Sequence, residues 1–179
     1  MKIYFAAHAT TKDNEAKVAS GWNDAELSDL GIQQAKAMGG TFKDIKLDLV
    51  CCSDLRRATD TAKIAFGDKY PVIVDKRLRE LNYGDFNGKP SEVVEPMKVR
   101  HIKEPFPNGE SYEQAVERVQ EFYQWLKAQH PRKVVLVVGH RATQYGLEIL
   151  KGATLEELLS TPFKWQPYWE YEIAVAQRL

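Results

Sequence analysis

Cysteine is nearly absent from this sequence, since only Cys51 and Cys52 occur among its 179 residues. The two are adjacent inside an apolar run, where neighbouring side chains of a strand point to opposite faces. This arrangement provides no disulfide framework and no spacing typical of cysteine metal ligands. We therefore expect both cysteines to be small buried hydrophobic residues rather than a redox pair.

The sequence also lacks a long hydrophobic run and an excess of charge of either sign. No apolar stretch approaches the about 20 residues that a membrane-spanning helix requires, and residues 2–8 are too short and interrupted for a signal peptide. The 25 basic and 25 acidic residues balance, so no overall field attracts nucleic acid or an anionic membrane. We expect a cytoplasmic protein without nucleic-acid or membrane partners, in which affinity for an anion comes from a local cluster.

Internal repeats, low-complexity segments and linkers are absent as well, so residues 1–179 are expected to form one domain. Hydrophobic residues make up 44% and charged residues 28% of the chain, which is ordinary for a globular protein. Short apolar runs predict strands, and the unbroken run at 134–138 is typical of a strand buried on both faces. The other predicted strands cover 3–7, 47–52, 72–74 and, nearer an edge, 170–176.

Helices are predicted between these strands, and several have a recognisable first residue. Ser28 is expected to cap a helix that ends at the glycine pair 39–40, and Ser53 is expected to cap a second. Ser111 and Gln114 form a capping-box pattern at the start of a third helix. Strands that alternate with helices indicate an α/β fold, a three-layer sandwich with a mostly parallel central sheet flanked by helices. Further helices are expected at about 142–150 and 154–159.

Polar residues follow four of the predicted strands at their carboxyl ends. His8 follows the first strand, Arg57 lies just after the second, Glu80 after the third and His140 after the fourth. In open sheets of this class, ligands bind at the carboxyl ends of the strands. A single histidine at a strand end is commonly a hydrogen-bonded structural residue, but four such groups at one sheet edge indicate a site.

Six motifs occur in order between residue 1 and about residue 150. They are Ala7-His8-Ala9-Thr10-Thr11 with Asn14; Gly21-Trp22-Asn23-Asp24 with Leu27-Ser28 and Gly31; Ser53-Asp54-Leu55-Arg56-Arg57-Ala58 with Thr61-Ala62; Leu78-Arg79-Glu80 with Tyr83-Gly84 and Asn87-Gly88; Pro107-Asn108-Gly109-Glu110-Ser111; and Val138-Gly139-His140. Each alone is a weak signal, whereas the ordered set resembles the histidine phosphatase superfamily, with its phosphoglycerate-mutase-like fold. The resemblance implies a phosphomonoesterase without metal or cofactor, which acts on a small phosphorylated substrate through a phosphohistidine.

The resemblance also implies roles for individual residues. His8 would be the nucleophile, since a neutral imidazole is nucleophilic at pH 7 without an activating base. Glu80 would protonate the leaving oxygen and then accept a proton from the attacking water. His140 would donate hydrogen bonds to the phosphoryl oxygens as charge develops. The remaining phosphate ligands would be Arg57, with its planar fork of donors, and the neutral donors Asn14 and Thr11.

Two positions depart from the family motif, because the arginine before the nucleophile is Ala7 here and the glycine after it is Ala9. That arginine holds the transferring phosphoryl group, and loss of such a contact costs about 10²–10³ in rate. In one interpretation Arg141, directly after His140, supplies the missing cation, although it is equally consistent with a surface arginine. In a second, the protein is a weakened or non-catalytic phosphate binder. In a third, Ala7 is an engineered substitution.

Other candidate residues have simpler explanations. Glu110 lies in a matched motif, but an acid near a helix N-terminus is usually a capping or dipole partner. His101 and His130 lie in polar contexts and are expected to face solvent. Three aromatic residues near the C-terminus are expected to pack on the core rather than to form a ligand cage. They are Trp165, Tyr168 and Trp169.

The segment at about 89–106 is predicted to be a short lid-like insertion. Mutases of the family carry longer insertions there and a C-terminal tail, because a phosphorylated intermediate must be kept from water. A short lid therefore favours a phosphatase over a phosphomutase. Its basic residues either bind a remote anionic group of the substrate or form a solvated face; they are Lys98, Arg100, His101 and Lys103. Substrate identity and oligomeric state are left open, since no helix shows a heptad seam.

Overall fold

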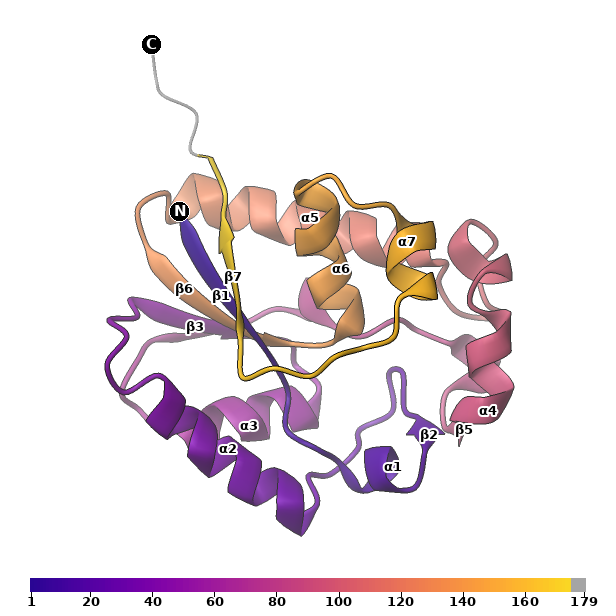
Figure 1. Ribbon diagram of the computed structural model, residues 1–179, viewed down its shortest axis with the longest axis horizontal. Helices are drawn as coiled ribbons and strands as arrows, with labels where there is room; N and C mark the ends of the chain where they lie inside the picture. The colour runs from indigo at the N-terminus through magenta and orange to yellow at the C-terminus, as the bar shows by residue number, and fades with distance from the viewer. Residues whose placement is uncertain (175–179) are drawn as a thin grey trace.

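A five-stranded sheet with the order β4-β3-β6-β1-β7 forms the centre of the computed structural model, which describes residues 1–174 (Figure 1). The strands are β1 (Lys2–Ala7), β3 (Leu49–Cys52), β4 (Val72–Val74), β6 (Val134–Gly139) and β7 (Trp169–Glu172). Neighbouring strands from β4 to β1 are parallel, and β7 lies antiparallel to β1. The mostly parallel α/β sandwich predicted from the alternation of strands and helices is confirmed.

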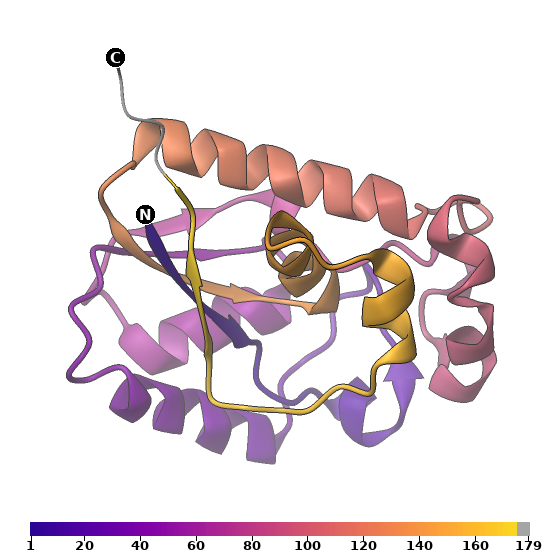
Figure 2. The same ribbon diagram turned by 45° about the horizontal axis from the view of Figure 1, so that its top comes forward.

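Two pairs of helices cover the two faces of this sheet (Figure 2). The helices α2 (Asp29–Thr41) and α3 (Arg56–Phe66) pack on one face, and α5 (Tyr112–Gln129) and α6 (Arg141–Leu150) on the other. Because strand residues alternate between the two faces, Cys51 belongs to the core under α5 and Cys52 to the core under α3. Both thiols are free and buried, and burial raises the pKa of Cys52 to about 12. The prediction of small buried cysteines is confirmed.

Short elements surround the carboxyl ends of the parallel strands. They are α1 (Lys12–Glu15), β2 (Val18–Ala19), β5 (Lys89–Pro90), α4 (Ser91–Val94), α7 (Leu155–Ser160) and the 3₁₀ turns η1 (Lys76–Leu78), η2 (Gly84–Phe86), η3 (Glu95–Met97) and η4 (Arg100–Ile102). β2 and β5 pair in a small antiparallel sheet, so the segment 89–106 begins there and continues through α4, η3 and η4. The segment 161–168, between α7 and β7, passes the carboxyl end of β1 in both views (Figures 1 and 2).

Several boundaries differ from the prediction, among them the start of β3 at Leu49 rather than at residue 47. The helix α2 continues through Gly39 and ends only at Thr41. A Cβ on Gly39 would lie 2.4 Å from the carbonyl oxygen of Ala65, so this glycine permits close packing of α2 on α3 rather than ending the helix. The N-cap of α3 is Leu55 rather than Ser53, whose hydroxyl contacts another strand end instead. The strand predicted at 170–176 covers Trp169–Glu172, and residues 175–176 lie outside the described residues.

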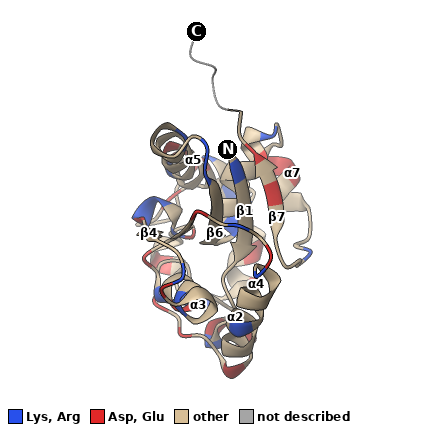
Figure 3. Ribbon diagram, turned by 90° about the vertical axis from the view of Figure 1, so that its left-hand side faces the viewer, with Lys and Arg blue, Asp and Glu red and all other residues tan. Residues whose placement is uncertain are grey.

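Charged residues of both signs are interspersed over the face shown in Figure 3. On the edge strand β7, Glu170 forms an ion pair with Lys2 of β1 at 2.8 Å. Charges at a sheet edge disfavour pairing with a strand of another chain. Within residues 1–174, none of the helices combines the length and the apolar character that crossing a membrane would require.

Candidate active site

A cavity of about 630 Å³ opens at the carboxyl ends of β1 and β6, where the sequence places its candidate residues. Five of the predicted site residues line it: His8, Asn14, Glu80, His140 and Arg141. The carboxyl ends of the strands therefore bring together side chains that lie up to 133 positions apart in the chain. The other lining residues are Phe5, Ala7, Thr10, Gln34, Glu95, Lys98, Gly139, Gln144, Phe163 and Trp165.

His8 is fixed in one orientation directly after β1. Its main-chain N–H donates to the carbonyl oxygen of Gly139 at 2.9 Å, which continues the pairing of β1 with β6. Its Nδ1 lies 2.8 Å from the carbonyl oxygen of Ala9. A carbonyl oxygen only accepts, so we assign the proton to Nδ1, and Nε2 keeps its lone pair. Burial, together with the positive Arg57, lowers the pKa of His8, so the ring is neutral at pH 7.

His140 lies beside His8 at the N-terminus of α6, with their ring centroids 5.0 Å apart. Its Nε2 is 2.6 Å from the hydroxyl oxygen of Ser53, which belongs to the motif after β3. Its Nδ1 is buried and has no hydrogen-bond partner among the described residues. Burial and the charge of Arg57 lower the pKa of His140 well below its usual value. The second histidine is therefore neutral and keeps one ring nitrogen for a ligand.

Glu80 holds its carboxylate against the first turn of α6. Its Oε1 accepts hydrogen bonds from the main-chain N–H groups of Leu81 at 2.8 Å and Ala142 at 3.1 Å. Its Oε2 accepts from the N–H of Arg141 at 3.1 Å. Free N–H groups at a helix N-terminus are natural partners of a carboxylate. Oε2 thus has the greater hydrogen-bonding capacity left for a group in the cavity.

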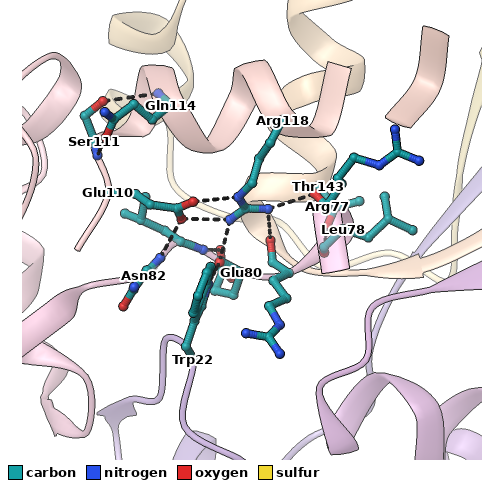
Figure 4. A network of polar contacts seen from close by, with 12 residues as sticks. Trp22, Arg77, Leu78, Glu80, Asn82, Glu110, Ser111, Gln114, Arg118 and Thr143 are labelled. Atoms are coloured by element: carbon teal, nitrogen blue, oxygen red, sulfur yellow. Dashed lines mark hydrogen bonds and ion pairs between the residues drawn. The ribbon is translucent and has the colours of Figure 1, made fainter. Parts of the chain in front are cut away.

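Arg118 of α5 fixes the main chain that carries Glu80 (Figure 4). Its guanidinium donates to the carbonyl oxygens of Arg77, Arg79 and Glu80 at 2.8–2.9 Å. It also forms two hydrogen bonds to the carboxylate of Glu110 at 2.7 and 2.9 Å. Glu110 is therefore engaged as a structural partner, in agreement with the preference for Glu80 as the acid.

Trp22 contributes to the same arrangement, since its Nε1–H donates to the carbonyl oxygen of Glu80 at 2.7 Å. Nothing in the sequence indicated a role for Arg118, whereas Trp22 stood out only as part of a matched motif and Ser53 as part of a motif and as an expected helix cap. Gln34 was also missed, although it lines the cavity and its Oε1 accepts from the N–H of Thr10 at 2.8 Å. Of these four residues, only Trp22 and Ser53 could have been identified from the sequence, through their positions inside the motifs.

Arg57 is buried, with 2% of its surface exposed, and does not line the cavity, although its charge acts on both histidines. Its partners within residues 1–174 are the carbonyl oxygens of Gly21 at 2.7 Å and Asn23 at 2.9 Å. Gly21 has a φ of 52°, a left-handed conformation that glycine adopts without strain and that orients its carbonyl group. Neither partner carries a negative charge. A buried guanidinium that is held only by neutral oxygens fits a site that receives an anion.

Thr11 and Asn14 hold each other in a capping box at the start of α1. The Thr11 hydroxyl accepts from the N–H of Asn14, and Oδ1 of Asn14 accepts from the N–H of Thr11, both at 3.0 Å. Thr11 is buried and does not line the cavity, whereas Asn14 does. The structure thus places Asn14 at the site directly and Thr11 behind it.

Arg141 reaches the cavity from the first residue of α6. Its guanidinium donates to Oε1 of Gln144 at 2.8 Å and to the hydroxyl of Tyr145 at 3.2 Å, and it stacks 4.5 Å from the ring centroid of Phe163. All three partners are neutral, so its charge is left available to an anion. Ala7 lines the same cavity and contributes no charge.

The structure also tests the predictions for His101 and for the three aromatic residues near the C-terminus. His101 is buried and stacked on Phe106 at 3.9 Å, so the prediction that it faces solvent is wrong. Trp165 is 67% exposed and lines the cavity, which contradicts the expectation that it packs on the core. Tyr168 and Trp169 do pack, against Phe42 and Phe5 respectively.

The basic residues of the segment 89–106 do not act as one group. Lys98 lines the cavity and is paired with Glu95. Arg100 is exposed and paired with Glu104, and His101 is buried. Among residues 1–174, no three His, Cys, Asp or Glu side chains are grouped as a metal ion would require.

Comparison with known proteins agrees with this geometry. The sequence model of the histidine phosphatase superfamily (branch 1) matches residues 3–164. The chain belongs to this superfamily. Among curated superfamily relatives, the 2,3-bisphosphoglycerate-dependent phosphoglycerate mutase of Allorhizobium ampelinum is 33% identical over 177 residues, which cover 88% of this chain and 83% of the mutase.

Other histidine phosphatase relatives carry phosphatase names. The Bacillus subtilis protein named Uncharacterized phosphatase PhoE is 30% identical over 148 residues, which cover 81% of this chain and 74% of that protein. The solved structure of Bacillus stearothermophilus YhfR superposes with a TM-score of 0.85 at 28% identity, covering 97% of this chain and 91% of YhfR. The chain thus belongs to the superfamily and has two histidines, Glu80 and the buried Arg57 in and around its cavity. Some of its relatives are named phosphatases.

Proposed function

We propose that this chain is a phosphomonoesterase that forms a phosphohistidine on Nε2 of His8. The observation that carries the proposal is the 2.8 Å contact between Nδ1 of His8 and the carbonyl oxygen of Ala9. It fixes the neutral tautomer whose free lone pair lies on Nε2, in a residue that lines the cavity. No further base is required to activate this nucleophile.

In the first step, the lone pair of Nε2 attacks phosphorus and the P–O bond to the alcohol breaks. Glu80, which begins this step in its protonated form, gives the proton on Oε2 to the departing oxygen and becomes a carboxylate; Oε2 is the less occupied of its two oxygens. In the second step, water attacks the phosphohistidine and passes a proton to Glu80, and the P–N bond breaks. Inorganic phosphate leaves, and His8 and Glu80 return to their starting states. Neither step requires a metal or a cofactor.

The charge of the phosphoryl group is met by donors on several sides. Arg57 and the Nδ1–H of His140 stabilise the oxygens of the phosphoryl group, and Asn14 adds a neutral donor. Arg141 supplies the positive charge that Ala7 lacks. The hydrogen-bond partners of Arg141 are neutral, and its side chain lines the same cavity. Preorganised donors of this kind, rather than covalent chemistry by the protein, carry most of the rate in phosphoryl transfer.

The competing function is a phosphate-ligand binder without turnover, and the uncharged Ala7 favours it. Release of inorganic phosphate from a panel of phosphomonoesters separates the two. We expect turnover of at least one ester, an acid-labile label on the protein after rapid quench with a ³²P-labelled ester, and loss of both in His8→Ala. The matched control is His130→Ala, which removes a histidine outside the cavity and is expected to keep turnover and label.

Binding of inorganic phosphate without release from any ester would contradict the proposal and support the binder. Transfer of the phosphoryl group between two positions of one substrate, without release, would instead identify a phosphomutase.

A further inference from the structure

A second, smaller cavity lies next to the first beside the nucleophile. It has a volume of about 140 Å³ and lies between α2 and the segment 161–168. Four residues line both cavities: Ala7, His8, Gln34 and Trp165. We call this smaller cavity the recess. Because the two share His8, a ligand with its phosphate at the nucleophile has access to both.

The chemistry of the recess differs from that of the main cavity. Apart from the shared residues, its walls consist of Ala9, Ala37, Met38, Thr41 and Pro167. None of the described residues that line it is Asp, Glu, Lys or Arg, whereas the main cavity has Glu80, Glu95, Lys98 and Arg141. The carbonyl oxygen of the Gln34 side chain is already bound to the N–H of Thr10. The recess therefore offers contact to apolar groups and little to a charged one.

The size of the recess suits one ring. An apolar cavity of about 150 Å³ in a protein core binds benzene, so about 140 Å³ holds a group of that size. Small side chains at Ala7 and Ala9 leave this volume open next to the nucleophile. On the opposite wall, Trp165 is 67% exposed, and a bound ring would cover its face. The flexible thioether of Met38 adapts to a group placed between them.

The position of the recess limits how a substrate enters it. The leaving oxygen of an ester must lie on the side of phosphorus opposite Nε2 of His8, toward Glu80. The recess lies on the flank of His8 instead, next to Ala7. An apolar group attached directly to the ester oxygen would thus point away from it. A spacer of several methylene groups allows the chain to turn back across the phosphate and reach the recess.

We propose that the recess is a specificity subsite for phosphomonoesters whose alcohol carries a ring-sized apolar group on a flexible spacer. Ala37, Met38 and Trp165 are its specificity-determining residues, and Ala7 keeps its entrance open. The inference rests on the proposed phosphatase function and adds the substrate class to it.

The test compares 4-phenylbutyl phosphate with n-butyl phosphate, which share the same spacer and ester bond and differ only in the ring. We expect the ring to raise kcat/KM by about 10- to 100-fold, as burial of a phenyl group in an apolar site implies. Ala37→Phe fills the recess from α2 and should bring the ratio of the two kcat/KM values toward one. Ala37 is exposed on its helix, so this variant is expected to fold.

Two further variants make the test specific. Trp165→Ala removes the opposite wall and should also lower the ratio. Gln33→Phe adds the same ring to an exposed position of α2 that lines neither cavity, and it should leave the ratio unchanged. Equal kcat/KM values for the two esters, or a ratio that Ala37→Phe and Trp165→Ala both leave intact, would overturn the inference while the phosphatase function stands.

Binding of non-hydrolysable phosphonates tests the recess in the case where the two esters are not hydrolysed. If neither ester is hydrolysed, calorimetry with 4-phenylbutylphosphonate and n-butylphosphonate tests the recess alone, and the proposed function itself fails only if no ester of the wider panel is hydrolysed. Tighter binding of the phenyl compound by about 10-fold or more, lost in Ala37→Phe, supports the subsite. Equal affinities of the two phosphonates would overturn it.

Discussion

The hydroxyl oxygen of Ser53 lies 2.6 Å from Nε2 of His140, although the two residues are 87 positions apart in the chain. Both are buried, and Nδ1 of His140 has no partner among the described residues. A neutral imidazole carries one proton, so a hydroxyl that donates to Nε2 places the proton on Nδ1. We assign the Ser53 hydroxyl as the donor to Nε2, because its oxygen already accepts from the N–H of Leu55 at 3.3 Å, and this assignment leaves the proton of His140 on Nδ1. We assign Ser53 as a positioning residue for the second histidine.

Replacement of Ser53 by alanine should lower kcat by about 10-fold, because His140 is then free to adopt the tautomer without a donor at Nδ1. KM should change less than kcat, since the ground state gains less from this donor than the transition state does. The ¹⁵N chemical shifts of the His140 ring report the tautomer directly and should move in the variant. Ser160→Ala, an exposed serine on α7, is the control. Unchanged kcat and unchanged ring shifts would refute the assignment.

Arg141 and position 7 should be coupled if Arg141 replaces the missing cation. Arg141→Ala in the chain with Ala7 is expected to lower kcat/KM by about 10²-fold, the usual cost of one lost charged contact in the transition state. The same substitution in an Ala7→Arg background should cost much less, because the new arginine meets the same charge. A double-mutant cycle on kcat/KM measures this coupling. Additive effects would show that Arg141 does not act in place of an arginine at position 7.

Glu80→Gln should reveal the general acid through the leaving group. Removal of the acid is expected to lower kcat/KM for ethyl phosphate by about 10²–10⁴-fold, because an alkoxide is a poor leaving group without a proton. The loss for 4-nitrophenyl phosphate should be far smaller, since nitrophenolate departs unaided. Glu95→Gln, which changes another acid of the same cavity, should affect both esters alike. A Glu80→Gln variant with equal losses for the two esters would exclude the acid role.

Arg118→Met should weaken both the fold and catalysis. The ion pair with Glu110 is largely buried, with 16% and 18% of the two side chains exposed, and removal of one partner leaves the other charge uncompensated. Such a change costs about 3 kcal/mol of the free energy of unfolding. The carbonyl of Glu80 also loses a donor, so kcat should fall further than the folded fraction explains.

Urea unfolding together with kcat at saturating substrate measures these two effects of Arg118→Met. Arg100→Met, which breaks an exposed pair with Glu104, should change neither by much. A loss of stability with full kcat would confine Arg118 to a structural role.

The sequence was sufficient to predict the sheet and the residues that follow its strands. Unbroken apolar runs mark β1, β3 and β6 because strands buried on both faces must be apolar throughout, whereas the short apolar run of β4 marks an edge strand whose two valines are exposed. Parallel strands then bring their carboxyl ends to one edge, which places His8, Glu80 and His140 together without knowledge of any contact. This prediction of the site depends on the backbone topology, which follows from the alternation of apolar strands with helices along the chain.

The side-chain contacts that hold the site in place could not be predicted from the sequence in the same way. Arg118 lies in an amphipathic helix, where an arginine is normally solvated, and no local pattern shows that it reaches three carbonyl groups of another segment. The orientation of His101 depends on Phe106, and the exposure of Trp165 depends on the path of the segment 161–168. These properties arise from the packing of distant segments, which residue type and spacing do not determine.

The two neutral histidines should make stability depend on pH below about 7. In the folded protein the pKa of His8 is lowered to about 3, and that of His140 is also lowered, whereas both return to about 6.5 when the chain unfolds. The unfolded state therefore binds more protons below pH 6.5, so the free energy of unfolding falls as the pH is lowered. For His8 the slope is up to about 1.4 kcal/mol per pH unit, or about 2 kcal/mol between pH 7 and 5, and His140 contributes in the same direction.

Urea unfolding at pH 7 and pH 5 measures this difference. His8→Asn should reduce the difference by up to about 2 kcal/mol, and His140→Asn should reduce it as well, because asparagine does not titrate. His130→Asn removes a half-buried histidine outside the cavity and serves as the control for the substitution itself. If the natural protein were equally stable at both pH values, the two rings would not be held neutral by the fold. The phosphohistidine mechanism would then need a base to keep His8 nucleophilic in mildly acidic solution.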